Sequence, residues 1–162
     1  MTPQELIEQI TSAFANVERG DGVTLHQAIA LDDYADDATV AAARLQYTDT
    51  YWIEVPRETL VNFESALSFM DELGTRYYLP VFMIAALEGY IDLSTPFFKI
   101  TNLMRALRKS MPEQVIAAYK FDRNQCLAIA NFLRFVVGEQ GENAESQSVL
   151  QVVWAWEDFV KE

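Results

Sequence analysis

Apolar residues recur at every third or fourth position along most of the chain, the spacing of helices that bury one face. The first such stretch opens with Thr2-Pro3-Gln4-Glu5, in which a threonine cap, a proline and a glutamate form a capping box. We expect Gly20 to end this helix. Its buried stripe is predicted to consist of Leu6, Ile7, Ile10, Phe14 and Val17.

The next stretch indicates two short helices joined by an acidic turn. Thr24 and Gln27 have the spacing of a second capping box, and "ATVAAARLQY" (38–47) continues with helix-forming residues. The turn between them runs from Asp32 to Asp37. "YWIEVP" (51–56) then predicts an extended connector that packs through Trp52.

The middle of the chain predicts the core. A helix is expected from Pro56 to a glycine cap at Gly74, followed by a helix over about 79–88 that is apolar all round. A helix with no polar face must be surrounded by others. It is therefore the predicted centre of the fold.

The C-terminal half continues the helical pattern. A stripe is predicted at 97–107, a short helix at 111–120, and a long helix from the Asp122/Gln125 capping box to Gly138. A last helix is expected at 149–160. The sequence thus predicts an all-α fold: a single domain over 1–162, an irregular bundle of about seven or eight helices around the central one.

Composition narrows the function classes. The net charge of −12 argues against nucleic acid and anionic membranes as partners, because both repel acidic surfaces. The excess lies at the ends: residues 1–55 hold ten acids against two bases, and 126–162 hold six against two. The lone Cys126 excludes an intramolecular disulfide, no apolar run reaches a membrane span, and no signal peptide is recognisable. We expect a cytoplasmic protein.

The sequence gives little indication of a catalytic or metal-binding site. The single histidine, His26, cannot form a triad without a partner, and none is indicated locally. Cys126 lies in an apolar stripe, where a buried small hydrophobe is expected. The ligand set for zinc is lacking, and no cofactor is indicated.

The acidic turn holds four carboxylates in six residues. Their spacing lacks the alternation, the glycine and the final glutamate of an EF-hand loop. Three ways of compensating these negative charges remain open: water with counterions, a divalent metal, or a basic side chain from another segment. The four residues are Asp32, Asp33, Asp36 and Asp37.

Arg76 precedes the predicted central helix, next to Tyr77 and Tyr78. A desolvated guanidinium needs a carboxylate because it cannot lose its proton, and Asp32 or Asp33 is the predicted partner. The favoured interpretation is a structural clamp. The alternative is a pocket in which Arg76 receives an anionic ligand between the two tyrosines.

Several motifs of this chain resemble a family of bacterial domains of unknown function. Members carry an Asp-Tyr turn, a lone tryptophan, a Leu-Ser-Phe-Leu-Asp segment and then Arg-Phe/Tyr-Tyr-Leu-Pro-Ala-Tyr/Phe-Met. Thr75 and Val81 depart from that pattern. The resemblance covers roughly residues 30–90 and implies a fold but no activity. Here it is carried by Asp32-Asp33-Tyr34, Ala43-Arg44, Trp52, Val55-Pro56, Leu60, "ALSFMDELG" (66–74) and "RYYLPVFM" (76–83).

The sequence therefore favours a binding or protein-interaction module over an enzyme. One alternative is a small-ligand binder or enzyme with a pocket near Arg76, Tyr77 and Tyr78. Another is an acidic, immunity-type protein that neutralises a basic partner. A homodimer is also open, because Trp154 and Trp156 point to different faces of the last predicted helix.

Overall fold

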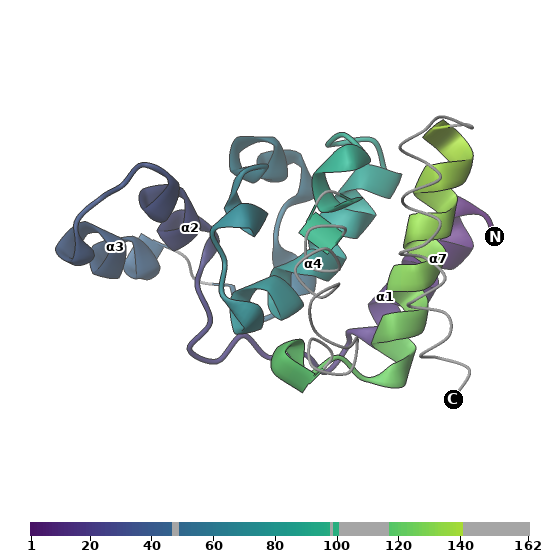
Figure 1. The fold of residues 1–162 in the computed structure, drawn as a ribbon, viewed down its shortest axis with the longest axis horizontal. Coiled ribbons are helices and arrows are strands. Elements are labelled where there is room, and N and C mark those ends of the chain that lie inside the picture. The colour runs from purple at the N-terminus through teal and green to yellow at the C-terminus, as the bar shows by residue number, and fades with distance from the viewer. Residues whose placement is uncertain (47–48, 98, 101–116, 141–162) are drawn as a thin grey trace, which may run out of the picture. The chain divides into compact units, whose positions relative to one another are not determined.

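The computed structural model describes residues 1–46, 49–97, 99–100 and 117–140. Every regular element in these ranges is an α-helix or a 3₁₀-helix, and none is a strand, so the predicted all-α class is confirmed. The chain divides into two compact units, one formed by residues 1–15 together with 97–162 and the other by residues 16–96 (Figure 1).

In the first unit, α1 (Pro3–Ala13) and α7 (Arg123–Gln140) lie side by side (Figure 1). Both begin at the predicted capping boxes, with the Glu5 amide donating to Thr2 Oγ1 at 3.2 Å and the Gln125 amide to Asp122 Oδ1 at 2.9 Å. The Gln125 side chain also donates to the Ala13 carbonyl at 3.2 Å. The buried stripes meet between the helices and include Leu6, Ile10, Phe14, Ile129 and Leu133.

Two predicted helix ends in this part of the chain are wrong. The first helix ends at Ala13 with Phe14 as its C-cap, well before Gly20. Gly20 does adopt the left-handed conformation (φ +55°), but it does so in the following loop. Gly138 lies inside α7, because a glycine in ordinary helical conformation does not by itself end a helix.

The second unit begins with the predicted pair of short helices, α2 (Leu25–Asp32) and α3 (Asp37–Ala43), joined by the acidic turn. They lie side by side at one end of this unit (Figure 1). Four 3₁₀ segments follow: η1 (Arg44–Gln46), η2 (Trp52–Glu54), η3 (Arg57–Phe63) and η4 (Ala66–Ser68). Trp52 is 2% exposed, as predicted, although its segment is a 3₁₀ turn and not an extended connector.

The region between Pro56 and Gly74 is not the single helix predicted. It forms η3 and η4, in which side chains compete for backbone groups; Thr59, for example, donates from its hydroxyl to the Pro56 carbonyl at 2.7 Å. A new helix, α4 (Glu72–Leu87), then begins at the N-cap Asp71. Gly74 therefore lies in its first turn and does not end a preceding helix.

Helix α4 is the predicted apolar core helix, but it starts seven residues earlier than expected. Residues 77–86 are all buried. Arg76 consequently lies inside the helix and not before it. Pro80 also lies inside, where it denies the Arg76 carbonyl its usual helical donor. Burial of large apolar side chains, each contributing about 1.5–3 kcal/mol, offsets that loss.

The loop before α2 packs directly on the first turn of α4. Asp71 Oδ1 accepts from the Gly74 amide at 2.8 Å and from the Val23 amide at 2.9 Å. A Cβ on Gly74 would lie 2.6 Å from the Val23 carbonyl oxygen, and a Cβ on Gly22 would lie 2.6 Å from the Gly74 nitrogen. Only glycines permit this backbone contact.

The elements predicted at 101–116 and 149–160, with Trp154 and Trp156, lie outside the described residues. Within the described ranges, no helix is both long enough and apolar enough to cross a membrane.

Candidate functional site

Tyr77 and Tyr78 converge on Asp49, a residue that the sequence did not single out. The Tyr77 hydroxyl donates to Asp49 Oδ2 at 2.5 Å, whereas the Tyr78 hydroxyl lies 3.5 Å from Oδ1, which is long for such a bond. The two rings pack edge to face with centroids 4.8 Å apart. Burial raises the pKa of Tyr77, so its hydroxyl remains a donor at neutral pH.

Arg19 supplies the positive charge at this cluster. Its guanidinium carbon lies 5.8 Å from the centroid of the Tyr77 ring, a cation–π contact. Its Nε and Nη1 atoms are closed to solvent and have no hydrogen-bond partner in the structure. These two guanidinium atoms therefore lie against protein in this polar cluster of Arg19, Asp49, Tyr77 and Tyr78.

Asp49 gives the cluster a pH dependence. Burial raises the pKa of this carboxyl, against the opposing effects of Tyr77 and Arg19. A carboxyl with a raised folded-state pKa stabilises the fold fully below its unfolded pKa, about 3.9, and that contribution is lost as pH rises through the folded value. Asp49→Asn removes this titration while keeping an acceptor for Tyr77. We therefore expect the unfolding free energy of the variant, relative to wild type, to increase between pH 4 and neutral pH in urea denaturation; a constant difference would contradict this assignment.

Arg76 is not paired with either of the aspartates proposed for it. The structure contains no hydrogen bond or ion pair between Arg76 and either Asp32 or Asp33, all three of which are described. Its Nε is buried without a hydrogen-bond partner. Asp32 is half-buried near the end of α2, and Asp33 is exposed as its C-cap. Of the predicted set, the structure brings together Tyr77 and Tyr78.

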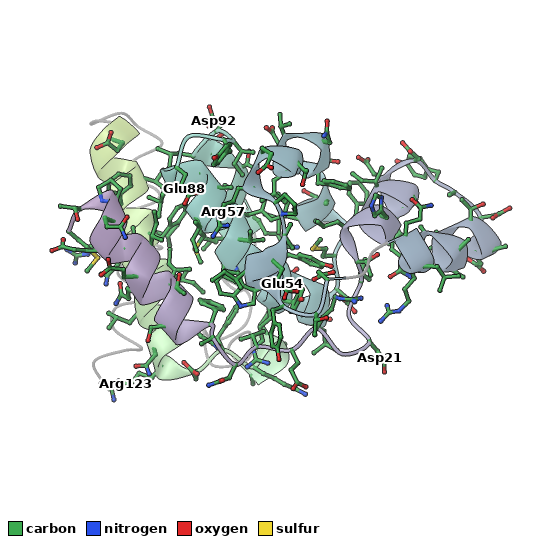
Figure 2. All side chains as sticks on the ribbon, turned by 180° about the vertical axis from the view of Figure 1, so that it is seen from behind. Asp21, Glu54, Arg57, Glu88, Asp92 and Arg123 are labelled. Atoms are coloured by element: carbon green, nitrogen blue, oxygen red, sulfur yellow. The ribbon has the colours of Figure 1, made fainter. Side chains whose placement is uncertain are left out.

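The arginine that does hold backbone segments together is Arg44. Its Nη2 donates to the Gly20 carbonyl at 3.0 Å, and its Nη1 lies within hydrogen-bond distance of the Asp21 carbonyl (3.3 Å), the Gly22 carbonyl (3.0 Å) and Gln27 Oε1 (3.2 Å). Asp21 is labelled in this loop in Figure 2. A second arginine of the unit, Arg57, faces Glu88 with 3.2 Å between Nε and Oε2 (Figure 2).

The acidic turn has a defined backbone. The Ala35 amide donates to the Ala30 carbonyl at 2.9 Å and the Tyr34 amide to the Leu31 carbonyl at 3.2 Å, the two bonds of a Schellman motif that ends α2. Tyr34 occupies the left-handed position of this motif, with φ +55°. The Tyr34 side chain is 92% exposed.

Four carboxylates flank that tyrosine without a cation between them. Asp36 caps α3 by accepting from the Thr39 amide at 2.8 Å, and Thr39 lowers the pKa of its carboxyl. No ion pair of the described residues involves Asp32, Asp33, Asp36 or Asp37. No group of three or more metal-ligating side chains occurs in the ranges that the structure describes.

The remaining polar candidates are accounted for by packing. Cys126 is fully buried, as predicted, and burial raises the pKa of its thiol to about 12, which disfavours the reactive thiolate at neutral pH. The His26 ring packs edge to face on Phe63 with centroids 5.1 Å apart.

Sequence reasoning missed Asp49, Arg19, Arg44 and Tyr34 as participants. Only Tyr34 carried a local signal, because a turn that must end α2 within "LDDYADD" requires one residue in the left-handed conformation. The others act across gaps of 17 to 58 residues. Spacing along the chain cannot reveal such contacts.

Comparison with known proteins gives one result. The profile of a family of unknown function, DUF6714, matches residues 2–158, which is nearly the whole chain. No curated protein and no solved structure matches it. The match extends past the 30–90 region in which the motifs were recognised, and the family, like those motifs, has no assigned activity. The chain belongs to the DUF6714 family.

Proposed function

We propose that this protein is a non-catalytic protein-interaction module whose docking element is the acidic turn, residues 32–37, with Tyr34 at its centre. The observation that carries the proposal is a tyrosine in the left-handed position of a Schellman motif with its ring in solvent. At the end of α4 the corresponding left-handed position is occupied by a glycine, Gly89, at φ +82°.

The fold buries almost none of the Tyr34 side chain. A left-handed conformation costs a residue with a Cβ roughly 1–2 kcal/mol, and an exposed ring recovers little of that by burial. Strained residues of this kind persist where they serve a site. Lys120, at φ +54°, shares the conformation but carries an ordinary surface side chain.

The surroundings of Tyr34 define the partner class. An exposed aromatic side chain within four carboxylates fits a protein surface that offers an apolar pocket with a basic rim. The net charge of −12 adds long-range attraction for such a partner and repulsion for nucleic acid. A basic protein is therefore the partner that we propose.

Capture from a cell extract tests this with three baits. Wild type is compared with Tyr34→Ala and with a variant in which Asp32, Asp33, Asp36 and Asp37 become asparagine, which retains a cap at position 36. We expect a basic protein that wild type captures at low salt and both variants lose. For that protein, Tyr34→Ala should weaken the Kd by about 30-fold, the effect of a 2 kcal/mol hot spot, in calorimetry.

A matched control changes the same number of charges elsewhere: Glu8, Glu58, Glu64 and Glu139, all exposed, become glutamine. This control variant should still capture the partner from the extract. Capture that survives the loss of Tyr34, or that disappears equally in the control, would contradict the proposed docking element.

A further inference from the structure

We infer that Arg44 is the positioning residue of the docking element: it fastens the open end of the α2–α3 hairpin and so holds the Tyr34 turn in one arrangement. This inference rests on the proposed function for its consequence on binding. Its structural part, the fastening of the hairpin, can be tested without any partner.

The hydrogen bonds of Arg44 join three parts of the unit. Arg44 follows α3 directly, whereas its acceptors are the carbonyls of the loop before α2 and the side chain of Gln27 in the first turn of α2. Gln27 Oε1 also accepts from the Thr24 amide at 3.1 Å, in the capping box of α2. One guanidinium therefore ties the end of α3 to the start of α2 and to the loop before it, at the open end of the hairpin.

Helix α2 packs on η4, but α3 has little apolar burial to hold it on α2. Helix α3 has seven residues and buries only one of them, Ala43, and α2 has eight and buries Leu25 and Ala28. Helices of this length are not stable alone in water. The part of α3 nearest the turn is exposed at Asp37, Ala38 and Thr39. With so little apolar burial, the polar contacts of Arg44 set how firmly α3 stays on α2.

The chemistry requires arginine. Its planar, permanently charged fork supplies donors to several carbonyls at once, whereas a lysine ammonium is a more strongly hydrated point charge on a flexible stem. Arg44→Lys should therefore restore only part of what Arg44→Gln loses. If a partner binds only the ordered hairpin, its apparent Kd rises in proportion to the loss of that ordered fraction.

Amide hydrogen exchange of the free protein provides the first test. In Arg44→Gln we expect amides of residues 28–43 to exchange at least tenfold faster than in wild type, with an intermediate rate in Arg44→Lys. The amides of residues 79–87 in α4 should exchange at rates within about threefold of those in wild type, which would show that the unit remains folded. Arg134→Gln, an exposed residue of α7, makes the same charge change and should leave the hairpin unaffected. Unchanged hairpin exchange in Arg44→Gln would overturn the inference.

Partner binding provides the second test. Arg44→Gln should weaken the Kd of the captured partner at least tenfold, mostly through a slower association rate, with Arg44→Lys between it and wild type. Faster hairpin exchange with an unchanged Kd, while Tyr34→Ala still loses the partner, would refute the positioning role alone. Faster exchange with no effect of Tyr34→Ala on any partner would instead refute the proposed function.

Discussion

Gly74→Ala is expected to lower the free energy of unfolding by about 3 kcal/mol. The added Cβ would lie 2.6 Å from the Val23 carbonyl oxygen and 2.8 Å from Asp71 Oδ1. The closer of these atoms belongs to the backbone, so relief requires the loop before α2 to move away from α4. That movement also weakens the bond from the Val23 amide to Asp71. Urea denaturation followed by circular dichroism measures the change.

The same substitution at Gly138 is the matched control. Gly138 lies in α7, and a Cβ there meets no atom within 4 Å. Alanine forms helix better than glycine by roughly 0.5–1 kcal/mol, so Gly138→Ala should raise stability. A loss of less than about 0.5 kcal/mol for Gly74→Ala would mean that the loop does not lie against α4 as described.

Asp71→Ala is the second large effect, again about 3 kcal/mol. Two amides, of Gly74 and Val23, donate to its Oδ1. Loss of the cap costs about 1–2 kcal/mol, and a part-buried amide left without an acceptor costs about 1–3 kcal/mol. The effect should appear in the same denaturation measurement.

Two variants isolate the causes. Asp71→Asn keeps a side-chain oxygen at the cap and should lose much less than the alanine variant. Asp36→Ala removes an exposed cap with one bond, to Thr39, and should destabilise the fold less than Asp71→Ala does. If Asp71→Ala costs no more than Asp36→Ala, the link between Asp71 and Val23 contributes nothing to stability.

Features encoded over a few adjacent residues could be predicted from the sequence. The three capping boxes, at Thr2, Thr24 and Asp122, start helices where expected, because a cap and its partner lie three residues apart. The buried α4 and Cys126 followed from continuous apolar spacing. The short α2–α3 pair followed from its caps and the acidic turn.

Features that depend on residues far apart along the chain could not be predicted from the sequence. Gly74 resembled the end of one helix, but it lies in the first turn of the next because the loop at Gly22 and Val23 must approach it closely. The central helix was expected to start at about residue 79, but α4 starts at Glu72 and runs through Pro80, because burial around the proline outweighs its tendency to break a helix. The contact between Tyr77 and Asp49 was not predicted, since the two residues lie 28 positions apart along the chain.

The most direct test of the proposed role compares Tyr34→Gly with Lys120→Gly, since both relieve a left-handed residue in a helix-ending turn. Each variant should be at least as stable as wild type. Relief of the left-handed conformation should exceed the cost of the greater freedom of glycine in the unfolded chain, for a net gain of about 0.5 kcal/mol. The deciding measurement is the Kd of the captured basic partner for both variants. If Tyr34 is present for that partner, Tyr34→Gly weakens binding by about 30-fold or more while Lys120→Gly leaves it unchanged. Equal, wild-type affinity in both variants would contradict a docking role for Tyr34.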